Sequence, residues 1–251
     1  MSPYLVRREI LIHASRETVF RFFTDSSLFA KWWGEGSTID PRPGGSVQIR
    51  YPNGIQASGE VLEIVDGDQI SFSFGYESGK PFGPGATVVT LTFGEAEGGT
   101  RVTLTHECPS EEIRDMHVPG WRYQMAVFAK VAADEQHSAA ESRVDAWYAA
   151  WGESDDDKRR ADLASILTDD VEFRDSWGVT SGLDDLLGHI AAARVHLSSA
   201  KLERQGDIRR SHGVVLADFI AANPEGEQVM AGTNVFLLAP DGRIRSVTGL
   251  A

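Results

Sequence analysis

Apolar residues alternate with polar ones through much of the first half of the chain. Five stretches between residues 47 and 106 carry an apolar side chain at every second position, and Gly, Pro, Asn and Asp residues separate them. This period is typical of strands that bury one face, so the sequence predicts an antiparallel meander. The apolar positions are Val47, Ile49 and Tyr51; Val61 to Val65; Ile70, Phe72, Phe74 and Tyr76; Val89, Leu91 and Phe93; and Val102, Leu104 and His106.

Helical spacing flanks this meander on both sides. Near the N-terminus an extended segment leads to Ser15, which is placed to cap a short helix with apolar residues at 19, 20, 22 and 23. A second short helix is predicted over residues 28–33 and is ended by Gly34 and Gly36. After Pro119, residues 120–136 have one apolar face and predict a long helix that closes the unit.

A small, polar segment at residues 133–142 separates this pattern from a second one. We expect domains at 1–135 and 143–251, joined by a linker at 136–142 that is helical and semi-rigid, because Ala, Glu and Gln are good helix formers. The second half predicts an α+β domain. Its expected elements are an initial helix from residue 143, a solvated acidic-basic loop at 153–160, a helix at 161–170, an extended segment at 171–175, a helix at 182–197, and three long strands ending at 243–250.

Length and charge narrow the function classes. The chain of 251 residues has room for two domains, and its net charge of -13 is shared almost evenly between them. Neither half is basic, which argues against nucleic acid and anionic membranes as partners. The single cysteine, Cys108, cannot form an intramolecular disulfide, and the N-terminus lacks the apolar core of a signal peptide. We therefore expect a soluble, cytoplasmic protein.

Several sequence segments in the first half resemble one protein family. VFRFFTDSSLFAKWWG, PGGSVQIRYPNG, SGEVLEIVDGDQISFSF, TRVTLTHE and a late GW are similar to the START-like (SRPBCC) homologues of the activator of the ninety-kilodalton heat-shock-protein ATPase. The resemblance covers about residues 5 to 135 and implies the helix-grip fold, in which a sheet wraps the last helix around a ligand cavity. The ligand-binding residues it suggests are Trp33, Phe72, Phe74, Tyr76, His106, Trp121 and Met125.

The alternation of side chains between the two faces of each strand predicts which residues line this cavity. His106 shares its face with Val102 and Leu104, so it should point into the sheet's concave side, either to orient a ligand or as a hydrogen-bonded residue at the end of a strand. Trp33 either lines the pocket or packs in the core. We expect an apolar cavity beneath the last helix, surrounded by Ile70, Phe72, Phe74, Tyr76, Leu91, Phe93, Trp121, Met125 and Phe128.

The second half resembles another superfamily. RVDAWYAAW, LTDDVEFRDSWGVTSG and VMAGTNVFLLAPDGRIRSVTGL are similar to the nuclear-transport-factor-two-like proteins, which include SnoaL-like polyketide cyclases and ketosteroid isomerase. The implied fold is a cone-shaped α+β barrel. The resemblance puts Asp175 at the position of the catalytic base, Asn234 at the second acid, and Trp147, with Tyr148 beside it, at the helix-one tyrosine. Because both oxyanion donors differ, steroid isomerisation itself is not expected.

Each of these residues also has a plain structural explanation. Asp175 could simply cap the turn before Trp177 and Gly178. Trp177 and Phe236 would form aromatic walls of a ligand pocket around Asp175. His189 and His196 lie seven residues apart on one predicted helix, which is too far for a metal site from that pair alone, and we expect neither a metal nor another cofactor.

Three functions remain open from the sequence. The first is a binding protein for small hydrophobic molecules with two pockets. The second is an enzyme of the cyclase or isomerase type that uses acid-base chemistry in the C-terminal pocket. The third is a co-chaperone-like stress protein, suggested by the family name. A homodimer is left open, and whether the protein is an enzyme is not decided by the sequence.

Overall fold

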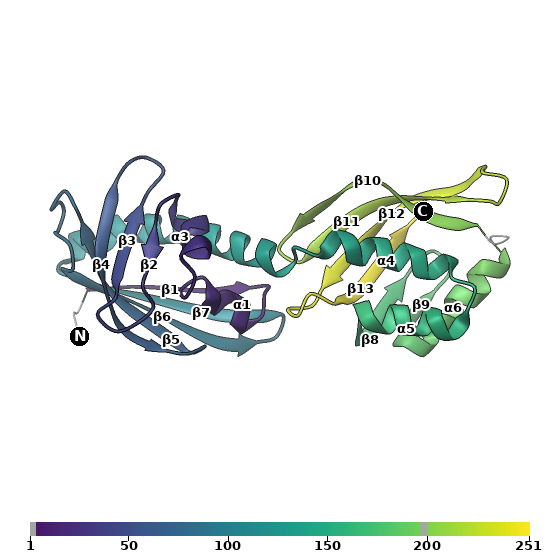
Figure 1. Ribbon diagram of the computed structural model, residues 1–251, viewed down its shortest axis with the longest axis horizontal. Coiled ribbons are helices and arrows are strands. Elements are labelled where there is room, and N and C mark those ends of the chain that lie inside the picture. The colour runs from purple at the N-terminus through teal and green to yellow at the C-terminus, as the bar shows by residue number, and fades with distance from the viewer. Residues whose placement is uncertain (1–3, 197–199) are drawn as a thin grey trace. The chain divides into compact units, whose positions relative to one another are not determined.

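A computed structural model of the chain describes residues 4–196 and 200–251 (Figure 1). The chain divides into two compact units, Met1–Glu135 and Gln136–Ala251. Each unit has one β-sheet, helices and a hydrophobic core of its own. The fold is therefore mixed, with helices and strands in both units.

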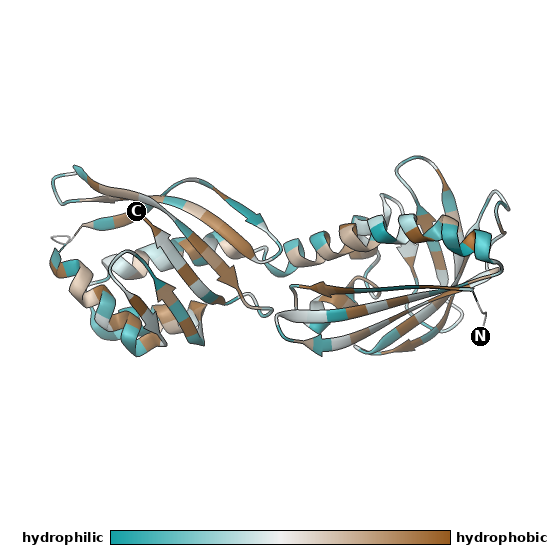
Figure 2. Cartoon of the chain, turned by 180° about the vertical axis from the view of Figure 1, so that it is seen from behind, coloured by the Kyte–Doolittle hydropathy of each residue, from teal (hydrophilic) through white to brown (hydrophobic). Residues whose placement is uncertain are grey.

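The first unit is built on an antiparallel sheet in the order β1-β7-β6-β5-β4-β3-β2. All five strands of the predicted meander are present, as β3 to β7. Along β3, β6 and β7 buried positions alternate with less buried ones, which gives the banded strands of Figure 2, whereas β5 is buried at most of its positions. The strands are β1 (Tyr4–Ile12), β2 (Thr38–Ile39), β3 (Ser46–Arg50), β4 (Gln56–Val65), β5 (Gln69–Tyr76), β6 (Thr87–Ala96) and β7 (Gly99–Cys108).

Three helices complete this unit: α1 (Arg16–Arg21), α2 (Ser26–Trp33) and α3 (Glu111–Gln136). As predicted, Ser15 caps α1, because its Oγ accepts a hydrogen bond from the Thr18 amide at 3.2 Å. Gly34 ends α2 at a φ of 140°, and a Cβ there would lie 2.2 Å from the Arg50 carbonyl oxygen. Only glycine fits this turn.

The long helix α3 begins earlier than the sequence predicts. We expected it after Pro119, yet it starts at Glu111 and carries Pro119 in its interior. Proline lacks the amide hydrogen that would bond the carbonyl four residues back, so sequence rules place a boundary there. The turn ahead of the proline is held by packing, because the His117 ring lies 5.4 Å from Phe82 and 6.0 Å from Tyr76.

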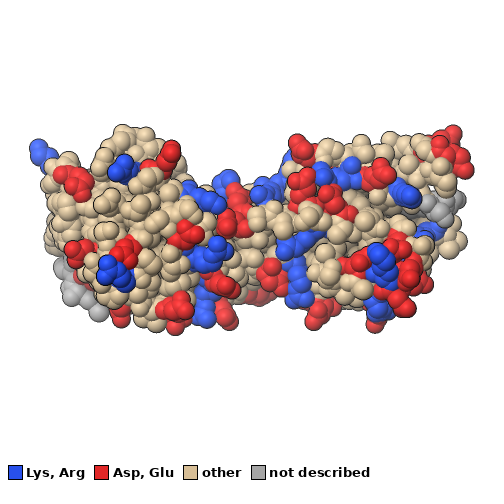
Figure 3. All heavy atoms as spheres, in the orientation of Figure 1, with Lys and Arg blue, Asp and Glu red and all other residues tan. Residues whose placement is uncertain are grey.

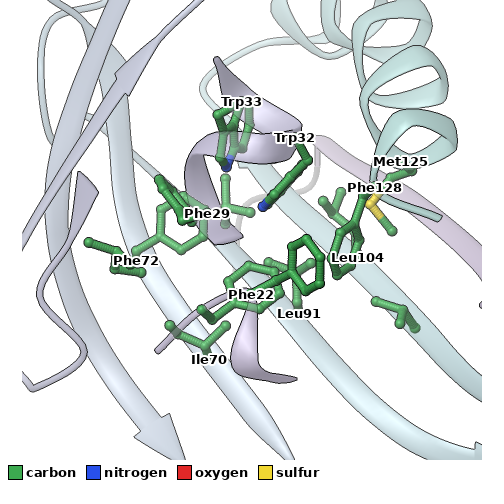
Figure 4. Close-up of a cluster of buried hydrophobic side chains, with 14 of the residues drawn as sticks. Phe22, Phe29, Trp32, Trp33, Ile70, Phe72, Leu91, Leu104, Met125 and Phe128 are labelled. Atoms are coloured by element: carbon green, nitrogen blue, oxygen red, sulfur yellow. The ribbon is translucent and has the colours of Figure 1, made fainter. Parts of the chain in front are cut away.

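The core of the first unit is mostly aromatic. Figure 4 shows Trp32 and Trp33 of α2 and Phe128 of α3 directed toward one another over the sheet. The rings of Trp32 and Phe128 lie 4.8 Å apart, and both tryptophans are almost completely buried. Because aromatic side chains bury large areas, this cluster ties α2 and α3 to the sheet.

The second unit has a mixed sheet in the order β10-β11-β12-β13-β8-β9, in which β13 and β8 are parallel. Helix α4 lies in front of strands β11 to β13 in Figure 1 and behind them in Figure 2, so it covers one face of the sheet. The elements are α4 (Ala140–Gly152), α5 (Asp156–Ile166), β8 (Leu167–Arg174), β9 (Val179–Ser181), α6 (Leu183–His196), β10 (Lys201–Ser211), β11 (Val214–Ala222), β12 (Gln228–Leu238) and β13 (Ile244–Leu250).

Several element boundaries in this unit were predicted wrongly. The expected loop at 153–160 is largely the first part of α5, because Asp155 accepts a hydrogen bond from the Lys158 amide at 3.0 Å and caps the helix. The expected helix at 161–170 ends at Ile166, after which the chain enters β8. Four long strands, rather than three, follow α6. The last residue of the predicted helix at 182–197, residue 197, lies outside the described residues.

On the face shown in Figure 3, positive and negative side chains are interspersed. Within residues 4–196 and 200–251, none of the helices combines the length and the apolar composition that a membrane crossing needs.

Candidate functional site

A cavity of about 190 Å³ lies in the first unit between α2, α3, strand β5 and the segment that joins β3 to β4. Its walls are aromatic, and the Trp33 ring lies 5.7 Å from Trp121 and 5.6 Å from Tyr51, both edge-on. The residues lining it are Trp33, Tyr51, Asn53, Ile55, Phe74, Tyr76, His117, Gly120, Trp121 and Gln124. Four of the residues predicted for this pocket, Trp33, Phe74, Tyr76 and Trp121, therefore surround one space.

The other residues proposed for this pocket lie in the packed core. Phe72 and Met125 are fully buried and do not line the cavity, and neither does His106. The rest of the predicted wall, namely Ile70, Leu91, Phe93 and Phe128, also belongs to the hydrophobic core. The cavity is thus confined to one end of the sheet, because α1, α2 and α3 fill the space over its middle.

His106 forms a hydrogen-bonded chain behind the cavity wall. Thr87 Oγ1 donates to the Phe74 carbonyl at 2.8 Å, so it accepts from His106 Nε2 at 2.9 Å. His106 Nδ1 then accepts the Trp121 indole N–H at 3.0 Å. Burial, with a smaller contribution from the nearby His117, lowers the pKa of His106 to about 3. His106 is therefore neutral near pH 7 and fixes the orientation of Trp121.

Tyr76 and His117 form the polar pair of the cavity. The Tyr76 Oη lies 3.0 Å from His117 Nε2, and His117 Nδ1 lies 2.7 Å from the Ile113 carbonyl oxygen. Burial lowers the pKa of His117 and raises the pKa of Tyr76, so both groups are driven toward their neutral forms. The cavity has an uncharged interior.

The second unit has a smaller pocket of about 50 Å³, and two of the predicted catalytic residues line it. Asp175 and Asn234 lie at this pocket together with Trp151, Phe173 and Trp177. Gly249 lies between them: a Cβ there would meet Asn234 Oδ1 at 3.2 Å and Asp175 Cβ at 3.4 Å. Two strand pairings bring these side chains together: Asn234↔Gly249 between β12 and β13, and Thr248↔Arg174 between β13 and β8, which places Asp175 beside Gly249.

The Asp175 carboxylate has three hydrogen-bond donors. Its Oδ1 accepts from the backbone amides of Trp177 at 2.8 Å and Gly178 at 3.0 Å, so Asp175 does hold the turn. Its Oδ2 lies 3.0 Å from His189 Nε2, and the side chains of His189 and Asp175 are 12% and 19% exposed. Asp175 is therefore at once a turn residue and a partly buried member of a carboxylate–imidazole pair.

The remaining predicted residues of the second unit lie around this pocket in different ways. Trp147 and Phe236 are fully buried core residues that do not line it. The Tyr148 hydroxyl donates to the Ala217 carbonyl at 3.2 Å, and burial raises the pKa of this tyrosine. Trp177 is 53% exposed and lies at the pocket edge. Of the predicted donors, only Asn234 lines the pocket with Asp175.

Sequence reasoning missed three polar residues of these sites. His117 was overlooked because Pro119 set the expected start of the helix too late. Gln124 was recoverable, since it follows Trp121 by three residues and precedes Phe128 by four on the apolar face of α3. His189 was considered only together with His196. In the described part of the chain, no three His, Cys, Asp or Glu side chains are grouped closely enough to hold a metal ion.

Comparison with known proteins agrees with this architecture in the first unit. Residues 13–133 match the family of Activator of Hsp90 ATPase homolog 1-like proteins. The match covers a little under half of the chain and places an AHSA1-type domain in the first unit. None of the curated proteins is significantly similar to the chain.

Solved structures resemble parts of the chain. An AHSA1-like protein from Rhizobium etli is 30% identical, with a TM-score of 0.41, over 51% of this chain and 81% of that one. The Aha1 dimer from Colwellia psychrerythraea is 16% identical, with a TM-score of 0.42, over 49% and 90%. A SnoaL-like family protein from Agrobacterium tumefaciens is 24% identical, with a TM-score of 0.42, over 46% and 96%. The SnoaL-like assignment of the second half stays a prediction.

Proposed function

We propose that the protein binds a small, largely apolar molecule in the cavity of the first unit. The observation that carries this proposal is the cavity itself, about 190 Å³ of space bounded by five aromatic side chains. An apolar cavity of about 150 Å³ is enough to hold benzene. Ligand sites are typically apolar clefts with a few placed polar groups, and Tyr76, His117 and Gln124 supply such groups here.

The wall of this cavity is prepared before a ligand arrives. Trp121 is held by His106, and Tyr76 by His117, so two of the lining rings are oriented by hydrogen bonds. Sites whose side chains are already fixed lose less conformational freedom on binding. We therefore expect a small ring compound to bind without rearrangement of α3.

Gly120 offers a direct test of the site. It lines the cavity, and a Cβ on it would meet nothing within 4 Å, so Gly120→Phe places a ring at the cavity without a backbone clash. We expect indole to bind the unmodified protein at micromolar strength in a calorimetric titration, and the variant to lose at least tenfold in affinity. The matched control is Gly188→Phe on α6, where a Cβ also meets open space. Unchanged binding to Gly120→Phe, or no binding to either protein, contradicts the proposal.

A second candidate function is acid-base chemistry in the pocket of the second unit. The observation that favours it is the Asp175–His189 pair at 3.0 Å beside an apolar pocket. A carboxylate has about four acceptor positions, and three are taken by Trp177, Gly178 and His189. The fourth position remains for a substrate proton. In this proposal Asp175 is the base, His189 positions it, and Asn234 is the nearby donor.

This second candidate has its own test. The probe is a small ketone such as cyclopentanone, whose α-hydrogens exchange with D2O when a base removes them, as followed by NMR. We expect Asp175→Asn to abolish any exchange above background and His189→Gln to reduce it, while Asp185→Asn, an exposed carboxylate on α6, leaves it unchanged. Exchange that is equal in the protein and in buffer removes ketone α-proton abstraction from the candidate functions.

The third function expected from the sequence stays a prediction. The co-chaperone-like role rests on the family name, and a name does not transfer function between chains. A homodimer, cytoplasmic localisation and the linker at 136–142 likewise stay predictions. The Agrobacterium protein is described as a candidate SnoaL-like isomerase, which is consistent with testing a carbonyl compound first.

A further inference from the structure

The hydrogen-bond directions at the cavity of the first unit can be assigned. The Ile113 carbonyl can only accept, so the His117 Nδ1 facing it at 2.7 Å carries the proton. His117 is held neutral by burial, and its Nε2 is then an acceptor. The Tyr76 hydroxyl therefore donates its proton to Nε2 at 3.0 Å. What Tyr76 Oη offers to the cavity is lone pairs only.

Gln124 provides a second acceptor by the same reasoning. Its side-chain Nε2 donates to the carbonyl oxygen of Trp32 at the end of α2, which fixes the orientation of the amide. Gln124 is only 7% exposed and lines the cavity. Its Oε1 bonds to no group within residues 4–196 and 200–251. The Gln124 side chain lines the cavity and its amide oxygen has no protein partner among the described residues, so a hydrogen-bond donor on a ligand can bond to it.

The other polar groups do not reverse this preference. The Tyr51 hydroxyl can donate or accept. The Asn53 amide, whose Oδ1 accepts the Ile55 amide at 3.2 Å, can donate through its nitrogen only at the exposed rim. The Trp33 indole N–H has no partner in the described part of the chain, but it is buried and does not reach the open space of the cavity. The lining includes no Lys or Arg side chain. A carboxylate in this space would face two acceptors and no cation, while the faces of Trp33 and Trp121 suit a flat ring.

We propose that the ligand of this cavity is a planar aromatic compound that donates a hydrogen bond and carries no negative charge, as a phenol, an indole or an aromatic amine does. The donor of the ligand meets Gln124 Oε1 or Tyr76 Oη, and its ring packs against the side chains of Trp33 and Trp121. This inference rests on the proposed ligand-binding function and specifies the chemical class that the same cavity takes.

The experiment compares ring compounds of nearly one shape and different hydrogen-bonding character. Indole donates through its N–H, benzofuran has an oxygen acceptor at that position, and indole-3-carboxylate adds a negative charge. In calorimetric titrations of the full chain we expect indole to bind about five- to tenfold more tightly than benzofuran, as one net hydrogen bond allows. We expect indole-3-carboxylate to bind most weakly.

Two variants locate the effect. Gln124→Met and Tyr76→Phe each remove one acceptor while keeping side-chain volume, and we expect the ratio of indole to benzofuran affinity to fall toward one in at least one of them. Gln205→Met, exposed on β10, is the matched control and should keep the ratio. The comparison of ligands on the unmodified protein stands even if a variant fails to fold.

The outcomes separate the two proposals. Equal binding of indole and benzofuran overturns the donor requirement and leaves the ligand-binding function in place. Tightest binding of the carboxylate overturns the requirement as well. If none of the three rings binds, both the donor requirement and the proposed function of the cavity are wrong.

Discussion

His106 shows how one buried residue couples the sheet to the cavity wall. Its Nε2 donates to Thr87 on β6 and its Nδ1 accepts from Trp121 on α3, so the neutral ring satisfies both partners. Protonation of Nδ1 would remove the acceptor for the Trp121 indole and place a charge in the core. Both effects disfavour the charged form, in line with the lowered pKa.

This arrangement predicts that the first unit loses stability in acid. The folded-state pKa of His106 is about 3 and the ordinary value is 6.5, so between these pH values the unfolded chain binds more protons. The free energy of unfolding should therefore be fully retained above pH 6.5 and fall by up to about 1.4 kcal/mol per pH unit below it. His117, whose pKa is also lowered, acts in the same direction.

Urea unfolding at pH 7, 5 and 4 measures this effect. His106→Gln keeps an acceptor and a donor but cannot titrate, so it should flatten the pH dependence. His196→Gln, exposed on α6, should leave the dependence unchanged. A variant His106→Gln that loses stability in acid as steeply as the unmodified protein would show that another group is responsible.

The position of a site residue could be predicted from the sequence where the alternation of inward and outward side chains along a strand determines it. Alternation along β7 put His106 inside the sheet, where it is fully buried. Its hydrogen-bond partners could not be predicted. Whether Thr87 lies beside His106 depends on the register of β6 with β7, and whether Trp121 does depends on how α3 packs on the sheet. Asp175 was expected either to cap a turn or to face a pocket, and it does both. His189 could not be paired with it without the packing of α6 on β8.

At the scale of elements, α3 carries two poor helix formers side by side, Pro119 and Gly120, next to the cavity. Gly120 adopts no positive φ, and a Cβ on it would meet nothing within 4 Å. We expect Gly120→Ala to stabilise the protein by about 1 kcal/mol, because alanine lowers the entropy of the unfolded chain.

Chemical denaturation of Gly120→Ala measures the gain, and Gly188→Ala within α6 is the matched control with a similar expected gain. A loss of stability at Gly120 alone would indicate that the helix needs flexibility at this turn. Gly120 would then serve the cavity through the flexibility it gives the helix, and not only by leaving space at the wall.

Helix α5 shows why charge runs mislead. The run of aspartates at 155–157 has the composition of a solvated loop, yet Asp155 caps α5. Asp156 and Asp157 lie in the first turn of this helix, where acidic side chains interact favourably with the positive end of the helix dipole. We expect Asp155→Ala to lower the free energy of unfolding by about 1 kcal/mol. Asp157→Ala is the control, with a smaller loss. Equal losses in thermal melts of the two variants would exclude a capping role for Asp155.

On the scale of the whole molecule, the two hydrophobic cores share no residue. We therefore predict two unfolding transitions in calorimetry of the full chain. Asp155→Ala should lower the midpoint of one, and Gly120→Ala should raise the midpoint of the other. If both substitutions moved a single common transition, the chain would unfold as one cooperative unit.

The sequence predicted more at this scale than at any other. Two α+β units, the meander and its closing helix follow from hydrophobic period and turn residues, which depend on local geometry. The sequence did not predict which residues line a cavity and which pack in the core. That outcome depends on packing between segments that are distant in the sequence. Phe72 and Met125 were expected at a ligand and instead fill the core.

The central claim is that the first unit holds a small ring compound in its aromatic cavity. A crystal structure of the protein with 5-bromoindole tests it most directly, because the bromine gives an anomalous signal that locates the ligand without bias. We predict one strong peak within the cavity, beside Trp33 and Trp121, with the ring N–H directed at Gln124 or Tyr76. An empty cavity, with bromine only on the surface or in the second unit, would contradict the account.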